Sequence, residues 1–177
     1  MDINISSFGL WFNNQLHHYD EKRYWKMREY VVSPQCNNRF KKYWYLYMLK
    51  KSDAFNNASM GTDINSGARF STPPHLPHGL NGIIISKYAL IGKNCKIYHQ
   101  VTVATKKIDG EFVSAKIGDN CTLGAKCTIL GGVTIGNNVK IGANAVVTHD
   151  LPDNCSAGGV PASILNEENS DYERSEE

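Results

Sequence analysis

A branched aliphatic residue recurs at every sixth position over much of the second half of this 177-residue chain. A period of six fits neither an amphipathic helix nor a simple alternating strand. It fits a triangular prism with three short strands per turn, in which each aliphatic side chain points inward and stacks on its equivalent one coil away. We therefore expect an all-β core built as a parallel β-helix. The aliphatic positions are Ile85, Ile91, Ile97, Val103, Ile117, Leu123, Ile129, Ile135, Ile141 and Val147.

Small residues hold the fifth position of each hexad, where we expect them to pack near a corner of the prism. Glycine and asparagine are frequent between the strands because they tolerate the backbone of tight turns. The small residues are Ala89, Cys95, Val101, Cys121, Cys127, Val133, Val139 and Ala145. The asparagines expected at corners are Asn94, Asn120, Asn137 and Asn144.

The chain divides into a helical segment, the β-helix and an acidic tail that is expected to be disordered. Their ranges are 1–60, 61–165 and 166–177. The aliphatic spacing widens to fourteen between Val103 and Ile117, so residues 104–116 are expected to form an inserted loop on a functional face. A less regular ladder is expected upstream, through Ile64, Phe70 and Leu76.

Two helices are expected in the first segment, at residues 21–32 and 38–54, because these stretches lack glycine and proline. The second is aromatic in its middle and basic at both ends. We expect it to pack on the open end of the prism, with its aromatic residues in the core and its lysines in solvent. The alternative interpretation is a peripheral contact of residues 39–51 with anionic lipid headgroups.

The sequence predicts neither a membrane span nor a signal peptide. No stretch approaches the roughly 18 apolar residues of a membrane span, and residues 1–10 contain Asp2 and no basic residue. The five cysteines form no C-x-x-C pair, as expected for free thiols in a reducing compartment. We expect a cytoplasmic protein with no nucleic-acid partner, and the lipid contact would place it at the inner face of the membrane.

Specific motifs accompany the repeat. They are Thr62-Asp63-Ile64-Asn65, Leu76-Pro77-His78, Gly82-Ile83-Ile84-Ile85, Ile91-Gly92-Lys93-Asn94, Ile117-Gly118-Asp119-Asn120, Leu123-Gly124-Ala125-Lys126, Ile135-Gly136-Asn137-Asn138, Ile141-Gly142-Ala143 and Gly159-Val160-Pro161-Ala162. Together they resemble the serine acetyltransferase family of hexapeptide-repeat enzymes over roughly residues 60–165. The short length and the segment 97–102 are similar to members found in bacterial surface-polysaccharide biosynthesis. The resemblance implies a left-handed parallel β-helix, acetyl-CoA-dependent O-acetyl transfer and a homotrimer.

In that family an Asp and a His form a catalytic dyad, and at the same spacing they match Asp63 and His78. Acetyl transfer to a hydroxyl needs a base during the attack, and a neutral imidazole is suited to this role. A carboxylate on the other ring nitrogen would fix the tautomer and stabilise the imidazolium. Tyr98 and His99 are candidate substrate-binding residues, with an outward-facing His99 as the alternative.

The resemblance also implies that acetyl-CoA lies in the groove between two prisms. The matching positions are Ala125, Ala143, Thr148 and His149, with Lys140 as a candidate phosphate contact. We expect no metal, because a carbonic anhydrase of this fold needs three histidine ligands and only His99 lies within the repeats.

The acceptor is expected to be a sugar hydroxyl of a surface-polysaccharide precursor, either a small molecule or lipid-linked. Serine acetyltransferases place an Asp directly before the catalytic His and an Arg in the loop, and these meet the charges of serine. The matching positions here are Pro77 and the stretch 113–117, which has no Arg. No cysteine synthase partner is expected, because the C-terminal isoleucine that docks into it is replaced by Glu177. The alternatives are serine as acceptor, as in cysteine biosynthesis, and a non-catalytic β-helix scaffold.

Overall fold

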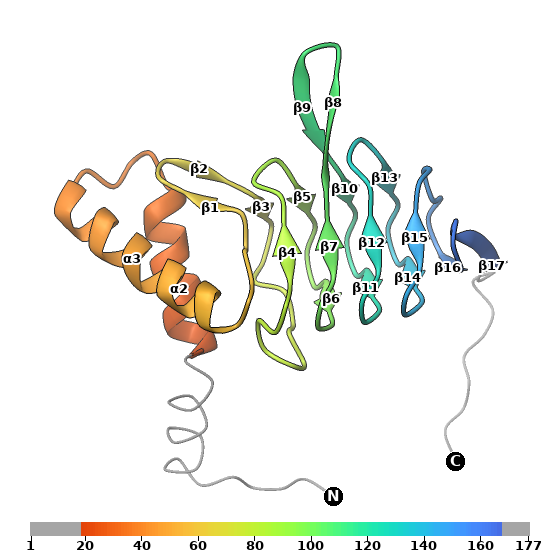
Figure 1. Ribbon diagram of the computed structural model, residues 1–177, viewed down its shortest axis with the longest axis horizontal. Helices are drawn as coiled ribbons and strands as arrows, with labels where there is room; N and C mark the ends of the chain where they lie inside the picture. The colour runs from red at the N-terminus through yellow and green to blue at the C-terminus, as the bar shows by residue number, and fades with distance from the viewer. Residues whose placement is uncertain (1–18, 168–177) are drawn as a thin grey trace, which may run out of the picture.

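Two helices and a three-sided parallel β-helix follow one another in the computed structural model, which describes residues 19–167 (Figure 1). The helices α2 (Glu21–Val32) and α3 (Arg39–Phe55) lie at the N-terminal end of the prism. Short strands then wind along its axis. The predicted fold class, an all-β core with a small helical appendage, is confirmed.

Three sheets form the sides of the prism, and each coil visits them in the same order. The first sheet contains β4 (Ile84–Ile85), β7 (Thr102–Val103), β12 (Thr128–Ile129) and β15 (Val146–Val147). The second contains β3 (Arg69–Phe70), β5 (Leu90–Ile91), β10 (Lys116–Ile117) and β13 (Thr134–Ile135). The third contains β6 (Lys96–Ile97), β11 (Thr122–Leu123), β14 (Lys140–Ile141), β16 (Cys155–Gly158) and the antiparallel β17 (Ser163–Glu167).

The chain turns at three edges between these sheets. The hairpin edge joins the first sheet to the second at residues 60–68, 86–89, 104–115, 130–133 and 148–150. The asparagine edge joins the second to the third at residues 71–74, 92–95, 118–121, 136–139 and 152–154. The histidine edge joins the third back to the first at residues 76–83, 98–101, 124–127, 142–145 and 159–162.

The core is the continuous stack of inward aliphatic residues that the repeat predicts. Every one of these side chains is at most 4% exposed. The parallel register places equivalents side by side, as with Ile91, Ile117 and Ile135 in the second sheet. Burying one such side chain contributes about 1.5–3 kcal/mol, so each coil stabilises its neighbours. The small residues of the fifth positions are buried as well.

A ladder of side chains closes the asparagine edge. Asn94, Asn120, Asn138 and Asn154 have φ between 54° and 58°, a left-handed conformation that asparagine tolerates. Each bonds the next through its side-chain amide, at 3.3, 3.1 and 2.7 Å. The expectation of Asn137 at this corner is wrong by one residue, because its neighbour Asn138 has the left-handed backbone.

The first coil departs from the predicted ladder. Met60 is fully buried and, by register, is the inward residue beside Ile85. Ile64 instead lies in a short hairpin of β1 (Thr62–Asp63) and β2 (Ser66–Gly67) at the hairpin edge. A search for branched aliphatic residues misses this arrangement because methionine fills the inward position.

The predicted upstream ladder and the predicted start of the C-terminal tail have different outcomes. Phe70 aligns with Ile91, and Leu76 is buried, so both extend the ladder as expected. The predicted disordered tail begins too early, because Asn166 belongs to β17 and pairs with Ser156. The rest of that tail lies outside the described residues.

The insertion is a β-hairpin rather than an irregular loop. Strands β8 (Thr105–Ile108) and β9 (Glu111–Ser114) pair in antiparallel fashion and project from the hairpin edge (Figure 1). At its base the backbone passes so close to Gly131 that a Cβ there would overlap the nitrogen of Lys106. Glycine at this position therefore allows the hairpin to lie against the next coil.

Helix α2 has the predicted range, and α3 begins and ends one residue later than predicted; each begins after a polar N-cap. The side chains of Asp20 and Asn38 accept backbone N–H bonds from the first turn of α2 and α3, respectively. The buried side of α2 includes Tyr24, Trp25 and Val31 and faces α3 and the first coil. Among residues 19–167, no helix is long and apolar enough to cross a membrane.

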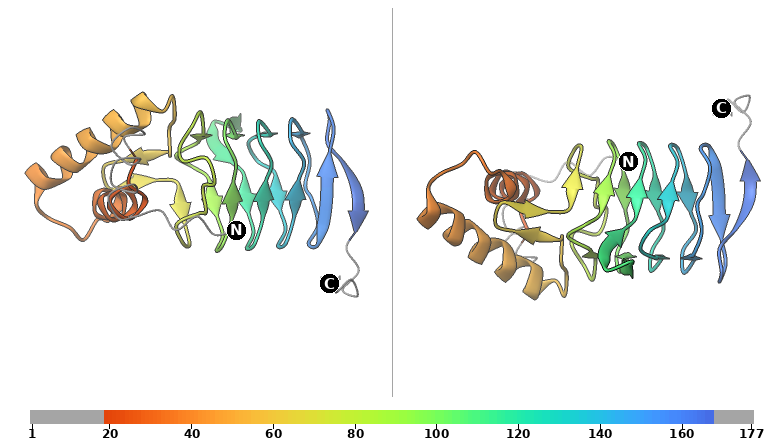
Figure 2. Two further views of the ribbon diagram at one scale, coloured as in Figure 1. Left: turned by 90° about the horizontal axis from the view of Figure 1, so that it is seen from below. Right: turned by 90° about the horizontal axis from the view of Figure 1, so that it is seen from above.

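The aromatic face of α3 lies in solvent, which corrects the expectation that it joins the core. Phe40 is 92% exposed, and Tyr43, Trp44 and Tyr47 are 56–60% exposed. Lys42 is buried instead, and its ammonium donates to the carbonyl of Ser33. In both views of Figure 2, α3 lies beside α2 at the N-terminal end of the prism.

Candidate functional site

Two histidines meet on the histidine edge near the N-terminal end of the prism. The Nδ1 atoms of His78 and His99 are 2.6 Å apart, and their ring centroids are 4.7 Å apart. The ring of Tyr98 meets His78 edge-on at 5.7 Å between centroids. His78 comes from the proline-rich segment that closes the first coil, and His99 comes from the turn one coil later.

Backbone hydrogen bonds hold these two turns in register. The N–H of Gln100 donates to the carbonyl of Asn81, and the N–H of Ile97 donates to the carbonyl of His75. The predicted candidates His78, Tyr98 and His99 therefore form one cluster. A hydrogen bond between two Nδ1 atoms requires one ring to donate and the other to accept, so the pair holds a proton between them. When His78 is the donor of this bond, its Nε2 carries no proton and is the nitrogen able to accept one; when His99 is the donor, the neutral His78 ring carries its proton on Nε2.

Asp63 lies on the hairpin edge, at the other side of the first sheet. One carboxylate oxygen accepts the N–H of Ile64, and the other lies 3.9 Å from the ammonium of Lys87. No hydrogen bond joins Asp63 to His78 within the described chain. The expected pairing is therefore not formed inside one subunit, because the two residues leave the prism at different edges. The ion pair with Lys87 has no signal in the sequence, since it depends on the register of the irregular first coil.

The expected coenzyme residues fall at different places on the prism. Ala125 and Ala143 stack one coil apart on the histidine edge, where the N–H of Asn144 donates to the carbonyl of Ala125. The same edge carries His99, whose carbonyl accepts the N–H of Lys126. This column of exposed or half-buried corner backbone runs directly on from the histidine pair.

The remaining candidates lie elsewhere. Thr148 and His149 are exposed on the hairpin edge, with Thr148 Oγ1 3.3 Å from His149 Nδ1. Lys140 is on the outward side of β14 in the third sheet, so the structure does not bring it to either edge. Within one chain, the expected coenzyme residues that lie at edges are therefore divided between the histidine edge and the hairpin edge.

The repeat cysteines are packing residues in this structure. Cys95, Cys121, Cys127 and Cys155 are buried free thiols. Burial raises the pKa of Cys127 to about 12, which keeps that thiol protonated and unreactive at neutral pH. No cluster of three metal-ligating side chains occurs among residues 19–167.

Comparison with known proteins identifies the repeat. Residues 114–149 match the family model described as bacterial transferase hexapeptide, six repeats. These coils therefore carry the hexapeptide repeat that this model describes in bacterial transferases. The match covers the regular coils that carry Ala125 and Ala143, and the histidine pair precedes it.

The curated relatives of this hexapeptide-repeat protein are serine acetyltransferases. It is 36% identical to that of Synechococcus elongatus over 106 residues, which are 59% of this chain and 43% of the relative. It is 32% identical to that of Mycobacterium tuberculosis over 111 residues, which are 63% of this chain and 48% of the relative. The chain therefore spans about half the length of the curated relatives it matches.

Solved structures of serine acetyltransferases share the fold. The enzyme from Vibrio cholerae superposes with a TM-score of 0.63 at 26% identity, covering 75% of this chain and 50% of that one. The enzyme from Neisseria gonorrhoeae gives 0.62 at 30% identity, covering 82% and 53%. These similarities confirm the predicted left-handed β-helix.

Proposed function

We propose that this hexapeptide-repeat protein is an acetyl-CoA-dependent O-acetyltransferase with His78 as its general base. The observation that carries the proposal is the His78–His99 pair, at the head of the edge that presents the backbone of Ala125 and Ala143. The names of the relatives support acetyl transfer to a hydroxyl. A scaffold without catalysis would have no need for an exposed imidazole, that of His78, in contact with the half-buried imidazole of His99.

The proposed reaction is a direct transfer. Nε2 of His78 accepts the proton of the acceptor hydroxyl while its oxygen bonds to the acetyl carbon. The tetrahedral intermediate then collapses, the carbon–sulfur bond breaks, and His78 returns the proton to the coenzyme sulfur. His99 holds Nδ1 of His78, which keeps the ring oriented toward the reacting atoms. The buried cysteines take no part.

We further propose a homotrimer that packs through the first sheet. The outward residues of that sheet, unlike those of the other two, carry no charge. They are Ile84, Thr102, Thr128 and Val146. The outward residues of the other two sheets include Arg69 and Lys116 in the second and Lys96 and Lys140 in the third. Burying an uncharged side against a second copy costs less free energy than burying a charged side.

Packing the first sheets around a three-fold axis completes the site. The histidine edge and the hairpin edge flank the first sheet, so the histidine edge of one subunit would face the hairpin edge of its neighbour. His78 would then meet Asp63 of a second copy, and the carboxylate would stabilise the protonated imidazole pair. The two halves of the coenzyme site, Ala125 with Ala143 and Thr148 with His149, would face each other in the same way.

Helix α3, which carries the exposed aromatic residues, lies beside this uncharged side. In Figure 1, α3 lies in front of α2, on the same side as β4, β7, β12 and β15. We therefore assign the helix face, Phe40 with Tyr43, Trp44 and Tyr47, to the same contact between subunits. Contact of residues 39–51 with anionic lipid remains the competing prediction for this face.

The relatives favour serine as the acceptor more directly than a sugar, because the curated relatives described above are named serine acetyltransferases. Two positions favour a sugar as the second candidate. Pro77 precedes the proposed base where the resemblance places an Asp, and the stretch 113–117 has no Arg. Serine would lack both charge-assisted partners, each contributing about 1.5–3 kcal/mol.

A thiol-release assay tests both the transferase activity and the identity of the acceptor. The full chain is mixed with acetyl-CoA and either serine or a panel of sugars and nucleotide sugars. Release that depends on an acceptor establishes the transferase, and the productive acceptor decides between serine and sugar. If none of these acceptors increases thiol release, the transferase proposal is wrong.

A further inference from the structure

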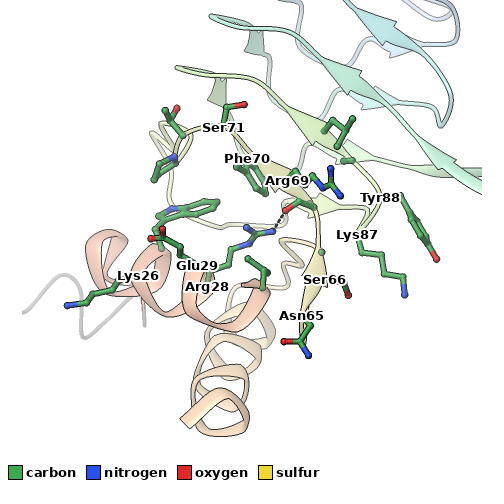
Figure 3. Close-up of a pocket in the computed structure, with 18 of the residues that line it drawn as sticks. Lys26, Arg28, Glu29, Asn65, Ser66, Arg69, Phe70, Ser71, Lys87 and Tyr88 are labelled. Carbon is green, nitrogen blue, oxygen red and sulfur yellow. Dashed lines mark hydrogen bonds between the residues drawn. The ribbon is translucent and has the colours of Figure 1, made fainter. Parts of the chain in front are cut away.

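A large pocket lies between α2, the hairpin edge and the start of the second sheet (Figure 3). Its volume is about 1140 Å³, at the upper end of the range typical of small-molecule sites. The walls come from α2, from the β1–β2 hairpin, from β3 and from the turn at Lys87 and Tyr88. The proposed acetyl transfer assigns no role to the residues that line this space.

Arg28 in the pocket wall is a buried cation without a counter-ion. It is 4% exposed, and its hydrogen bonds go to the Thr62 hydroxyl and to the carbonyls of Met60 and Ala68. All three acceptors are neutral, and no carboxylate pairs with it among the described residues. Burial lowers the pKa of Arg28 to about 10. A charge held in this way is costly unless an anion approaches it.

Asp53 is the acid whose charge acts on Arg28, but it does not pair with it. Asp53 accepts the hydroxyl bond of Tyr24 at 2.6 Å, and burial raises the pKa of its carboxyl. The carboxyl group of Asp53 is engaged by that hydroxyl and makes no hydrogen bond or ion pair with Arg28 among residues 19–167. The aromatic rings of Trp25 and Phe70 flank the guanidinium at 5.4 and 4.6 Å and hold it in place.

The pocket lining carries more positive than negative charge. Four exposed cations line it, Lys22, Lys26, Arg69 and Lys87, against the two acids Glu21 and Glu29. The side chain of Arg69 projects from β3 beside the pocket in Figure 3, and it makes no hydrogen bond or ion pair within residues 19–167. The ring of Tyr88 at the rim is 42% exposed and is stacked on Phe112, with ring centroids 5.7 Å apart.

We infer that this pocket binds the diphosphate and adjoining groups of an activated sugar. A diphosphate matches the buried Arg28 and the free Arg69, and a sugar or base matches the aromatic wall. The pocket also reaches the proposed active site, because Lys87 lines it and lies 3.9 Å from Asp63. The role of this ligand as the acetyl acceptor rests on the proposed function, whereas its binding does not.

Two sources share this chemistry, a soluble nucleotide sugar and a lipid-linked sugar diphosphate. Calorimetric titration of the full chain without acetyl-CoA measures the first, with UDP-N-acetylglucosamine as the probe. Flotation with neutral vesicles that contain a prenyl-diphosphate-linked N-acetylglucosamine measures the second. Binding of the first probe indicates a nucleotide source, and binding of the second alone indicates a lipid source.

Arg69→Gln tests the site itself, with Lys116→Gln as the matched control on the outward side of the same sheet. We expect Arg69→Gln to weaken binding about tenfold or more and Lys116→Gln to leave it unchanged, with equal melting temperatures. If neither probe binds, or if Arg69→Gln binds as the wild type does, the inference is overturned. Thiol release with a small acceptor that lacks phosphate reports on the proposed function separately.

Discussion

The Nδ1 atoms of His78 and His99 lie 2.6 Å apart, although 21 residues separate them in the chain. This contact joins the predicted base to a residue that the sequence suggested only as a substrate contact. It also uses Nδ1 of His78, the ring nitrogen that Asp63 would bond in the catalytic dyad implied by the family resemblance. The orientation of the base inside one subunit therefore comes from a second imidazole.

His78→Ala is expected to lower kcat by about 10²–10⁴, because general-base catalysis contributes that much. Binding of the coenzyme should survive, since Ala125 and Ala143 are unchanged. His75→Ala is the matched control, because His75 is exposed on the same proline-rich segment. Steady-state kinetics and coenzyme titration measure both properties. Near-normal turnover in His78→Ala would show that the base is misassigned.

His99→Ala is expected to lower kcat less than His78→Ala does, with little change in the KM for the acceptor. The reason is that His99 orients the base and does not itself take the proton. Comparing kcat with KM separates this role from substrate binding. A raised acceptor KM at unchanged kcat would instead make His99 a substrate-binding residue.

Asp63→Asn and His78→Ala should complement each other if the dyad forms between subunits. Each variant alone lacks one member at every interface. Trimers reassembled from an equal mixture should regain about a quarter of the wild-type activity, since about three quarters of the trimers are mixed and every mixed trimer contains one intact interface of three. Activity is measured after dilution from mild denaturant, with each variant refolded alone as the control. A mixture no more active than its components would place both residues in one subunit or remove Asp63 from the site.

Phe40→Ser combined with Trp44→Ser should weaken the trimer. These side chains are 92% and 60% exposed in one subunit, and losing their burial should raise the midpoint concentration for assembly by about tenfold or more. Sedimentation velocity measures the mass, and Leu165→Ser, which is 63% exposed at the other end of the prism, is the control. An unchanged trimer that has lost binding to anionic vesicles would support the lipid contact instead.

Asp53→Asn should be more favourable for stability, relative to the wild type, at pH 8 than at pH 4. Burial raises the pKa of Asp53 in the folded chain, whereas an unfolded aspartate titrates near ~3.9. The stability from its bound proton is complete below that unfolded value and is lost as the pH rises through the folded pKa. Asparagine stays neutral and avoids this loss. The difference in Tm between variant and wild type should therefore be more positive at pH 8, and an equal difference at both pH values would contradict the account.

The β-helix was predictable because its core is periodic in the sequence. Each coil is a local repeat, and inward positions from Ile85 to Val147 follow from spacing alone. The same reasoning failed in the first coil, where Met60 fills the inward place and Ile64 turns into a hairpin. It also failed for α3, since an aromatic stripe shows that a helix has an apolar face but not what covers that face.

The candidate site was likewise predictable from the sequence only in part. The sequence by itself determined the β-helical repeat, the resemblance to a family with a left-handed fold, and the residue types of the site. These depend on the spacing of residues and on motifs read along the chain. Only the tertiary structure decided which residues meet, because the edge from which a side chain projects depends on the lengths of irregular turns. Those turns bring His78 to His99, send Asp63 to another edge, and bury Arg28 without a carboxylate beside a pocket.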